Sequence, residues 1–317
     1  MKSLAVCICT YNPDLTLLRE VFTHSARSEA LALETWTFER LVIDNNSNEL
    51  IRIEIQKMAE EFNFGYVRED AQGLTFARLR AIAESNADFY AFIDDDNLVD
   101  SDFFVEAANI VAENPRIGCF SGEVVTTSSA YPLKNWQKRF RGLLVHRELS
   151  GNQWGNSLFL DNITPCGAGM ICNQQAALRY AKFHRDEERP IILDRSGGSL
   201  MSGGDNDLAF CAIDAGFGMG VFSSLRVKHV ISAKRFRLFY LLKLCTSISA
   251  SRVVLEYYWR ESTSGAASLV YTLARRTLAF DFFGVLFAIA ELMGFCAGKK
   301  YVHNLKKDQV NRVVSES

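Results

Sequence analysis

Alternation of strand-like and helix-like segments constrains the first hundred residues of this 317-residue chain more than any other feature. Short apolar runs recur between stretches with helical periodicity. The predicted strands are residues 4–9, 40–43, 66–67 and 89–93, and the predicted helices are residues 15–25, 49–62 and 75–85. Such alternation predicts an α/β fold with a Rossmann-like, mainly parallel sheet.

Three consecutive carboxylates, Asp94, Asp95 and Asp96, directly follow the apolar segment 89–93. The carboxyl ends of strands are where open α/β sheets bind ligands. Because carboxylates held so close repel one another, a hard cation such as Mg²⁺ or Mn²⁺, carrying a phosphate-bearing substrate, is the natural compensation. A solvated acidic turn after a strand is the alternative.

Polar residues also follow the first two predicted strands: Thr10 and Asn12 after one, Asp44 and Asn46 after the other. In a parallel sheet these side chains converge on one rim, which is the geometry that a nucleotide site needs. The sequence contains neither a GxGxxG fingerprint nor a Walker P-loop. A nucleotide is therefore expected to be held by side chains and a metal ion rather than by a glycine cradle.

Six short motifs, in order along residues 3–230, resemble those of family 2 glycosyltransferases with the GT-A fold. They are residues 9–12 (CTYN), 42–47 (VIDNNS), 73–78 (GLTFAR), 93–96 (IDDD), 166–170 (CGAGM) and 203–208 (GGDNDL). Six motifs in order at plausible spacing make the resemblance specific. It implies a GT-A catalytic domain over residues 1–230 and inverting transfer of a sugar from a nucleotide diphosphate sugar.

On the donor side, the resemblance implies that Asp94 and Asp96 form the family's DxD pair, with Asp96 in direct metal contact. Asp94 would contact the ribose or the outer shell of the metal, and Asp95 takes the metal contact if the strand ends one residue later. His229 follows the acidic segment 203–208 at a sequence distance that resembles that of the family's metal-binding histidine. A packed histidine without a ligand is the alternative. The metal would neutralise charge developing on the departing nucleotide diphosphate.

The same resemblance implies a set of further donor-binding residues around the base, ribose and diphosphate. Those expected at the base and ribose are Thr10, Tyr11, Asn12, Asp44 and Asn46. Arg78 is expected to approach the diphosphate; a surface ion pair on its helix is the alternative.

Displacement at the anomeric carbon also requires a base that takes the proton of the acceptor hydroxyl. Asp205 is the predicted base, because it follows a glycine-rich loop and precedes a helix-like run. Asp207 is predicted to cap that helix or to contact the acceptor, and Gly167, Ala168 and Gly204 are predicted on the acceptor side. Simple helix capping by either aspartate is the alternative. Gly204 departs from the family, which usually has an acidic residue there, and this bears on acceptor binding more than on the base.

The eight cysteines include no CxxC pair and no spacing against histidines that suggests zinc. Buried, reduced thiols in a cytoplasmic protein are therefore expected. The apolar run at residues 4–9 is too short for a signal peptide and is interpreted as the first strand, so no export is expected.

Charge is distributed unevenly, although the formal net charge is only −2. Residues 234–307 contain 12 Lys/Arg against 4 Asp/Glu, whereas residues 1–233 contain 22 against 31. Bulky apolar residues are interleaved with the basic ones, which is typical of interfacial helices and unlike a nucleic-acid-binding stripe. Residues 231–317 are therefore predicted to be a basic, amphipathic helical region that associates with an anionic membrane surface.

Residues 277–297 are nearly all apolar and long enough to span a bilayer, but Asp281 and Glu291 would each be costly in hydrocarbon. The residues that recur at helical spacing on one face are Thr277, Asp281, Gly284, Ala288 and Glu291. One helix lying in the membrane plane, or re-entering it, is therefore predicted. A helix packed on the catalytic domain, or in a homo-oligomer interface, is the alternative.

Together these patterns predict a metal-dependent transferase on the cytoplasmic face of the inner membrane that adds one sugar to a lipid-linked or polysaccharide acceptor. The absence of a Gln-x-x-Arg-Trp motif after Asp207 and of multiple hydrophobic spans argues against a processive synthase. A nucleotidyltransferase that makes a nucleotide sugar is one alternative, although its usual glycine- and basic-rich phosphate loop is missing. A non-catalytic nucleotide- or glycan-binding membrane adaptor is the other.

Overall fold

The computed structural model describes residues 1–185, 193–195 and 199–316, with side chains up to residue 307. The chain divides into two compact units. The first contains residues 1–133, 144–192 and 204–233, and the second contains residues 134–143, 193–203 and 234–317. The second unit thus includes two segments from within the region that the motifs assign to the catalytic domain.

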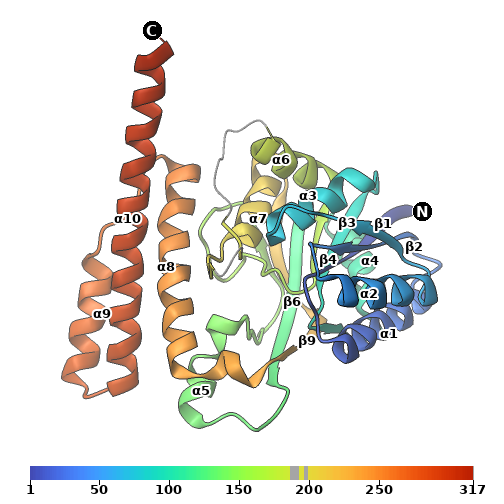
Figure 1. Ribbon diagram of the computed structural model, residues 1–317, viewed down its shortest axis with the longest axis horizontal. Coiled ribbons are helices and arrows are strands. Elements are labelled where there is room, and N and C mark those ends of the chain that lie inside the picture. The colour runs from blue at the N-terminus through green and yellow to red at the C-terminus, as the bar shows by residue number, and fades with distance from the viewer. Residues whose placement is uncertain (186–192, 196–198, 317) are drawn as a thin grey trace. The chain divides into compact units, whose positions relative to one another are not determined.

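A mixed sheet forms the centre of the first unit, with strand order β3-β2-β1-β4-β8-β6-β9-β5 and β7 paired to β9 (Figure 1). The strands are β1 (Lys2–Thr10), β2 (Trp36–Asp44), β3 (Gly65–Arg68), β4 (Phe89–Asp94), β5 (Asn97–Val99), β6 (Ile117–Ser128), β7 (Gln153–Gly155), β8 (Met170–Asn173) and β9 (Gly218–Ile231). Strands β3, β2, β1 and β4 are parallel, as the alternation predicts, and β8 then pairs antiparallel with both β4 and β6. The α/β fold class is confirmed.

Helices cover both faces of this sheet (Figure 1). On one face lie α1 (Leu15–Leu31), α2 (Glu49–Glu61) and α4 (Phe103–Glu113); on the other lie α3 (Leu74–Glu84), α6 (Gln174–Arg185) and α7 (Gly204–Asp214). The chain moves outward from β1 to β3 and then returns through α3 to β4, on the other side of β1. Because crossovers are right-handed, this reversal puts α3 on the face opposite α1 and α2. The strand order therefore reverses between β1 and β4, which is where ligands bind in open α/β sheets.

The buried cysteines belong to this two-sided core. All eight cysteines are free; seven are buried, and Cys296 is exposed. Burial raises the pKa of the Cys7 and Cys119 thiols well above their usual range, because a thiolate would be desolvated there. The buried thiols are therefore packing groups rather than nucleophiles.

The second unit is helical, with α5 (Asn135–Arg139), α8 (Leu238–Arg260), α9 (Ala267–Leu278) and α10 (Phe282–Glu316). Helices α8 and α10 run parallel: the Ser249 Oγ donates to the Glu291 carbonyl oxygen at 2.7 Å, and residues four positions earlier, Cys245 and Phe287, also contact. Any side chain at Gly294 would collide with the backbone of α8. Small residues therefore allow the two helices to approach closely.

Two of the described helices, α8 and residues Phe282–Lys307 of α10, are long and apolar enough to cross a membrane. The prediction of one continuous helix over residues 277–297 is wrong, since the chain turns at residues 279–281 between α9 and α10. Phe280 adopts a left-handed conformation with φ 51°. The Asp281 carboxylate accepts from the Gly284 N–H at 3.0 Å, so this aspartate caps a new helix instead of belonging to a polar face.

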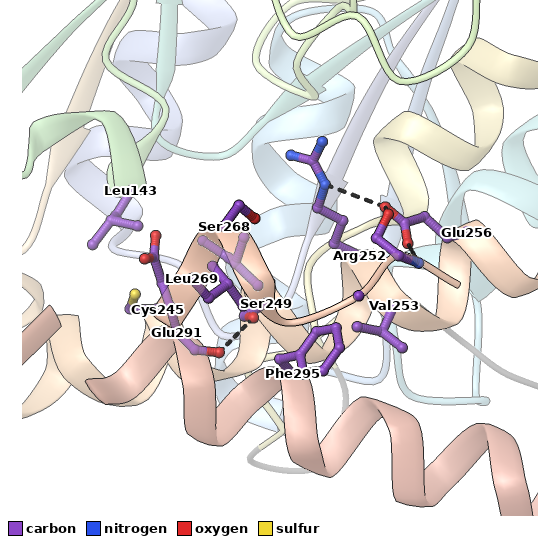
Figure 2. A pocket seen from close by; sticks show the side chains of 13 residues that line it. Leu143, Cys245, Ser249, Arg252, Val253, Glu256, Ser268, Leu269, Glu291 and Phe295 are labelled. Atoms are coloured by element: carbon purple, nitrogen blue, oxygen red, sulfur yellow. Dashed lines mark hydrogen bonds and ion pairs between the residues drawn. The ribbon is translucent and has the colours of Figure 1, made fainter. Parts of the chain in front are cut away.

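A cavity of about 370 Å³ lies within this helical unit (Figure 2). Glu256, only 5% exposed, faces it and accepts hydrogen bonds from Ser264, at 2.8 Å from the N–H and 3.0 Å from the hydroxyl. The Arg252 guanidinium lies 3.7 Å from the same carboxylate. These bonds tie the connection before α9 to α8, so the polar lining serves the structure of the unit.

Replacing Glu256 by Gln should destabilise the protein, because an amide nitrogen cannot accept one of the two Ser264 hydrogen bonds. The amide N–H₂ introduced at position 256, which is only 5% exposed, would face the Ser264 donor without an acceptor, and a buried donor left unsatisfied costs about 1–3 kcal/mol. At about 2–4 °C per kcal/mol, the thermal midpoint should fall by roughly 2–12 °C in calorimetry. Glu261→Gln, at an exposed position, is the matched control and should shift the midpoint by less than about 1 °C. Equal midpoints for both variants would contradict the assignment.

Candidate active site

The predicted rim forms at the carboxyl ends of β1, β2 and β4. The strand register aligns Thr10 with Asp44 and Cys9 with Asp94, so the ends of the three strands lie level with one another. Asp94 is the last residue of β4 and is partly exposed, as are the two aspartates after it. The acidic run therefore lies at the point where the strand order reverses.

Asp95 is tied across the rim to the end of β1. The buried Thr10 donates its hydroxyl to Asp95 Oδ2 at 2.6 Å. Burial, reinforced by the negative charges of Asp96 and Asp94, raises the pKa of Asp95 to about 7, although the Thr10 hydrogen bond opposes this. Near neutral pH the Asp95 carboxyl is therefore protonated in part of the molecules. The acidic cluster thus lacks enough nearby positive charge to keep all three carboxylates ionised.

Asp96 faces His229 across the pairing of β5 with β9. Asn97 is aligned with His229 in that pairing, and the His229 Nε2 lies 3.2 Å from Asp96 Oδ1. The other ring nitrogen of His229 is buried, and no hydrogen-bond partner for it exists among the described residues. The structure therefore brings together two residues that are more than 130 positions apart in the chain.

This pair fits a small divalent cation. The 3.2 Å between Asp96 Oδ1 and His229 Nε2 is that of a hydrogen bond, and a carboxylate and an imidazole are both groups that could hold such an ion. Among the described residues no group of three or more His, Cys, Asp or Glu side chains could hold a metal ion. A cation here would thus depend on substrate oxygens for its remaining ligands, as Mg²⁺ commonly does.

Asp44 is fully buried at the end of β2, and both of its carboxylate oxygens have protein partners. The Tyr66 hydroxyl donates to Oδ2 at 2.8 Å, and the Ser47 N–H donates to Oδ1 at 2.9 Å. Burial, together with the Asp44 charge, raises the pKa of Tyr66 to about 12. Arg68, at the end of β3, reaches Asp44 at 3.7 Å. Sequence reasoning missed Arg68, although the strand-end rule that located the others also applies to it.

Neighbouring loop residues are held in turns by side-chain hydrogen bonds. Asn12 and Asn46 both have positive φ, of 45° and 67°. The Asn12 Oδ1 accepts from the Asn48 N–H at 3.0 Å, and Asn46 Oδ1 accepts from the Arg68 guanidinium at 2.6 Å. Tyr11, in contrast, is half exposed at the rim. The asparagines brace the loops, and Tyr11 leaves an aromatic ring open to solvent.

Asp205 lies in the first turn of α7, next to the segment that leads into β8. The Gly167 N–H donates to Asp205 Oδ2 at 2.9 Å, and the Asn206 N–H is 3.0 Å from Oδ1. Because Met170 of β8 pairs with Phe92 of β4, Gly167 lies beyond the carboxyl end of β4. Asp205 is thereby held at the same edge of the sheet as the acidic run.

Arg78 is buried beneath this edge. Its side chain is 2% exposed and lies over the Phe92 ring at 5.9 Å. A Cβ on Gly167 would come within 3.0 Å of the Arg78 Nη2, so glycine permits the close approach of this segment to the guanidinium. The alternative of a surface ion pair is wrong, because Arg78 is one of the largest fully buried side chains.

Asp207 points into the interior rather than toward the rim. It is fully buried, and its Oδ2 lies 3.2 Å from Nε2 of His184 in α6. Ala168 and Gly204, also predicted on the acceptor side, are buried next to Gly167 and at the start of α7. Sequence reasoning missed His184, for which no motif provides a signal.

A family model described as glycosyl transferase family 2 matches residues 5–184, more than half of the 317 residues. The chain belongs to glycosyltransferase family 2. The resemblance seen in the motifs is thereby confirmed. Among proteins with curated descriptions, none matches this chain.

Solved structures with a similar fold include those of TarS from S. aureus. TarS 1–349 in complex with UDP-GlcNAc aligns with 79% of this chain and 66% of that one, at 13% identity and a TM-score of 0.50. A longer TarS structure aligns with 91% of this chain and 55% of that one, at 13% identity and a TM-score of 0.49. The present chain thus spans less than two thirds of the length of each of these two TarS chains. At 13% identity, the first alignment shows a shared fold alone.

Proposed function

We propose that this family 2 glycosyltransferase transfers one sugar from a nucleotide diphosphate sugar to an acceptor hydroxyl, with inversion at the anomeric carbon. The observation that carries the proposal is that the sheet edge presents two separate acidic sites. One is the run Asp94 to Asp96, and the other is Asp205, held by the Gly167 N–H at 2.9 Å. An inverting displacement needs one site for the leaving group and another for a base.

On the donor side, Asp96 and His229 would hold Mg²⁺ or Mn²⁺, with Asp94 and Asp95 contributing charge beside it. When bound, the cation acts as a Lewis acid that stabilises negative charge on the leaving diphosphate. The exposed Tyr11 ring offers a stacking surface for the nucleobase. Tyr11 is assigned to contact the nucleotide. The residues assigned to shape the rim around it are Thr10, Asn12, Asp44, Asn46 and Arg78, of which Asp44 and Arg78, both buried, would act through their neighbours.

On the acceptor side, Asp205 would take the proton from the attacking hydroxyl as its oxygen bonds to the anomeric carbon and the bond to diphosphate breaks. The Gly167 N–H bonds Oδ2 and the Asn206 N–H bonds Oδ1, so backbone groups orient the carboxylate, and each oxygen keeps a lone pair that can accept the proton. Gly167, Ala168 and Gly204 are assigned to the backbone wall of the acceptor site. Because Asp207 is buried against His184, its contribution would be to hold α7 in place.

We place the enzyme on the cytoplasmic face of the inner membrane, with residues 1–230 as the catalytic domain and residues 231–317 as a membrane-binding region. Support comes from the two long apolar helices and from the excess of Lys and Arg in residues 234–307. A lipid-linked or polysaccharide acceptor in cell-surface glycan synthesis follows from that location.

Product analysis tests the proposal. Purified enzyme with Mn²⁺ should convert a nucleotide diphosphate sugar to free nucleotide diphosphate, slowly with water alone and faster with a membrane extract that supplies the acceptor. Proton NMR of the product should show the anomeric configuration opposite to that of the donor. Pyrophosphate release from a nucleoside triphosphate and a sugar phosphate would instead identify a nucleotidyltransferase. Binding without turnover would identify an adaptor.

A further inference from the structure

One end of the helical unit gathers three segments that are far apart in the sequence. We call this end the basic tip; it comprises residues 134–143, 234–243 and 275–282. The Gln137 side chain donates to the Phe236 carbonyl oxygen at 2.9 Å, just before α8 begins. The Trp136 ring stacks on Phe283 at 5.0 Å, where α10 begins. Helix α5 therefore joins the starts of the parallel helices α8 and α10, and the end of α9 lies beside them (Figure 1).

The basic tip is strongly positive. Its three segments contain ten Lys/Arg and a single acidic residue, Asp281. Both terminal guanidinium nitrogens of Arg139 bond the Asp281 carboxylate, and the Gly284 N–H bonds it as well. The Arg139 guanidinium and that N–H hold the pKa of Asp281 at about 2, below its usual range. The one negative charge is thus engaged within the protein. Six of the remaining cations are exposed: Lys134, Lys138, Lys234, Arg237, Lys243 and Arg275.

Large apolar side chains at the same end are almost fully exposed. The exposed fractions are 82% for Phe239, 80% for Leu278, 95% for Phe280 and 67% for Phe282. Phe280 and its neighbours form the turn between α9 and α10. Phe280 adopts a left-handed backbone conformation there, which glycine would adopt more easily. The surfaces of soluble monomeric proteins rarely expose such an apolar cluster. An apolar cluster surrounded by cationic side chains fits an anionic lipid surface.

The arrangement of the helices argues against a bilayer span by both α8 and α10. Because these helices run parallel, the chain between them would have to return across the membrane. That return consists mainly of α9, whose 12 residues extend only about 18 Å, against about 30 Å of hydrocarbon. The remaining backbone would lie in lipid without hydrogen-bond partners. Docking by one end avoids this cost.

We propose that the basic tip inserts into an anionic bilayer, with Phe239, Leu278, Phe280 and Phe282 entering the acyl boundary while the surrounding Lys and Arg contact lipid phosphates. This inference deepens the membrane placement of the proposed function and rests on it. It replaces an in-plane helix over residues 277–297 with insertion of a specific turn. The α9–α10 turn is then the deepest point of the protein in the membrane.

Vesicle cosedimentation of the full chain tests this. Binding is expected to vesicles of phosphatidylglycerol and phosphatidylethanolamine but not to phosphatidylcholine alone, and it should weaken with salt. Phe280→Ser combined with Phe282→Ser should lower partitioning at least about 10-fold, since each phenylalanine loses favourable burial. Lys138→Glu should lower it about 5-fold or more. Tyr271→Ser with Met293→Ser, at positions 70% and 61% exposed on α9 and α10 away from the turn, is the matched control and should change it less than about 2-fold.

Tryptophan fluorescence gives a second readout of insertion that does not depend on variants with reduced binding. In Phe280→Trp, the fluorescence added to that of the wild type, which has four tryptophans, should shift to shorter wavelength with anionic vesicles and be quenched by brominated acyl chains. An unchanged spectrum, or loss of binding only in the Tyr271/Met293 variant, would overturn insertion by the basic tip. Hydrolysis of the nucleotide sugar with water should be equal in all variants. If the wild type binds vesicles but lacks hydrolysis, the proposed function fails while the tip assignment stands.

Discussion

Asp205→Asn should lower kcat by about 100-fold to 10,000-fold, the usual contribution of a general base. The amide oxygen can still accept the Gly167 N–H, which lies 2.9 Å from the carboxylate, so the local structure should persist. The amide cannot take the acceptor proton. Nucleotide affinity should change less than about 2-fold, because a base acts on the acceptor in the transition state. Single-turnover kinetics and equilibrium nucleotide binding would measure the two effects separately.

A matched control for this prediction lies on the same helix. Asp214, at the other end of α7, pairs with Arg179 at the surface, and each side chain is about one third exposed. Asp214→Asn removes the same charge from α7 and should leave kcat within about 2-fold, since surface ion pairs contribute little. Equal losses of nucleotide binding and turnover in Asp205→Asn would contradict the assignment of Asp205 as base.

Asp96→Ala should abolish the metal-dependent stabilisation of the enzyme by its nucleotide diphosphate. A ligand at 100 times its Kd stabilises the native state by about 2.7 kcal/mol, which corresponds to a rise of several degrees in the thermal midpoint. A thermal-shift panel of UDP, GDP, TDP, CDP and ADP, with and without Mn²⁺, should show this rise for one nucleotide in the wild type. The variant should show none, because the cation loses the carboxylate that faces His229 at 3.2 Å.

Two further variants sharpen the metal assignment. His229→Gln removes the second proposed ligand and should weaken the Mn²⁺-dependent shift as well. Asp102→Ala is the matched control: this exposed aspartate at the start of α4 makes no capping hydrogen bond, so the nucleotide shift should be retained. A full shift in Asp96→Ala, or its loss in Asp102→Ala, would refute a cation site at Asp96.

Much of the rim could be predicted from sequence because local patterns determine strand ends. The alternation of periodicities located β1, β2 and β4 to within a few residues, and the rule for parallel sheets then placed Thr10, Asp44 and Asp94 at one edge. Seven buried cysteines likewise follow from apolar runs. None of these inferences needs knowledge of which distant segments touch.

Other features depended on contacts between segments remote in the chain. The orientation of Asp207 toward His184 and the burial of Arg78 next to Gly167 arise where α6, α7, α3 and the approach to β8 meet. Periodicity alone also failed at residues 279–281, where an apolar run continues but the helix does not. There Asp281 bonds both Arg139 and the start of α10, a pairing across more than 140 positions that no local pattern encodes.

The sequence by itself determined the family, the α/β order of the catalytic region and the residues that end its strands, because motifs and periodicity are local properties of the chain. The tertiary structure alone decided which of those residues face one another. It joined Asp96 to His229 through the β5–β9 pairing, held Asp205 against Gly167, and brought three basic segments to one end of the helical unit. These juxtapositions depend on the packing of complementary surfaces, which is a property of the whole fold rather than of any one segment.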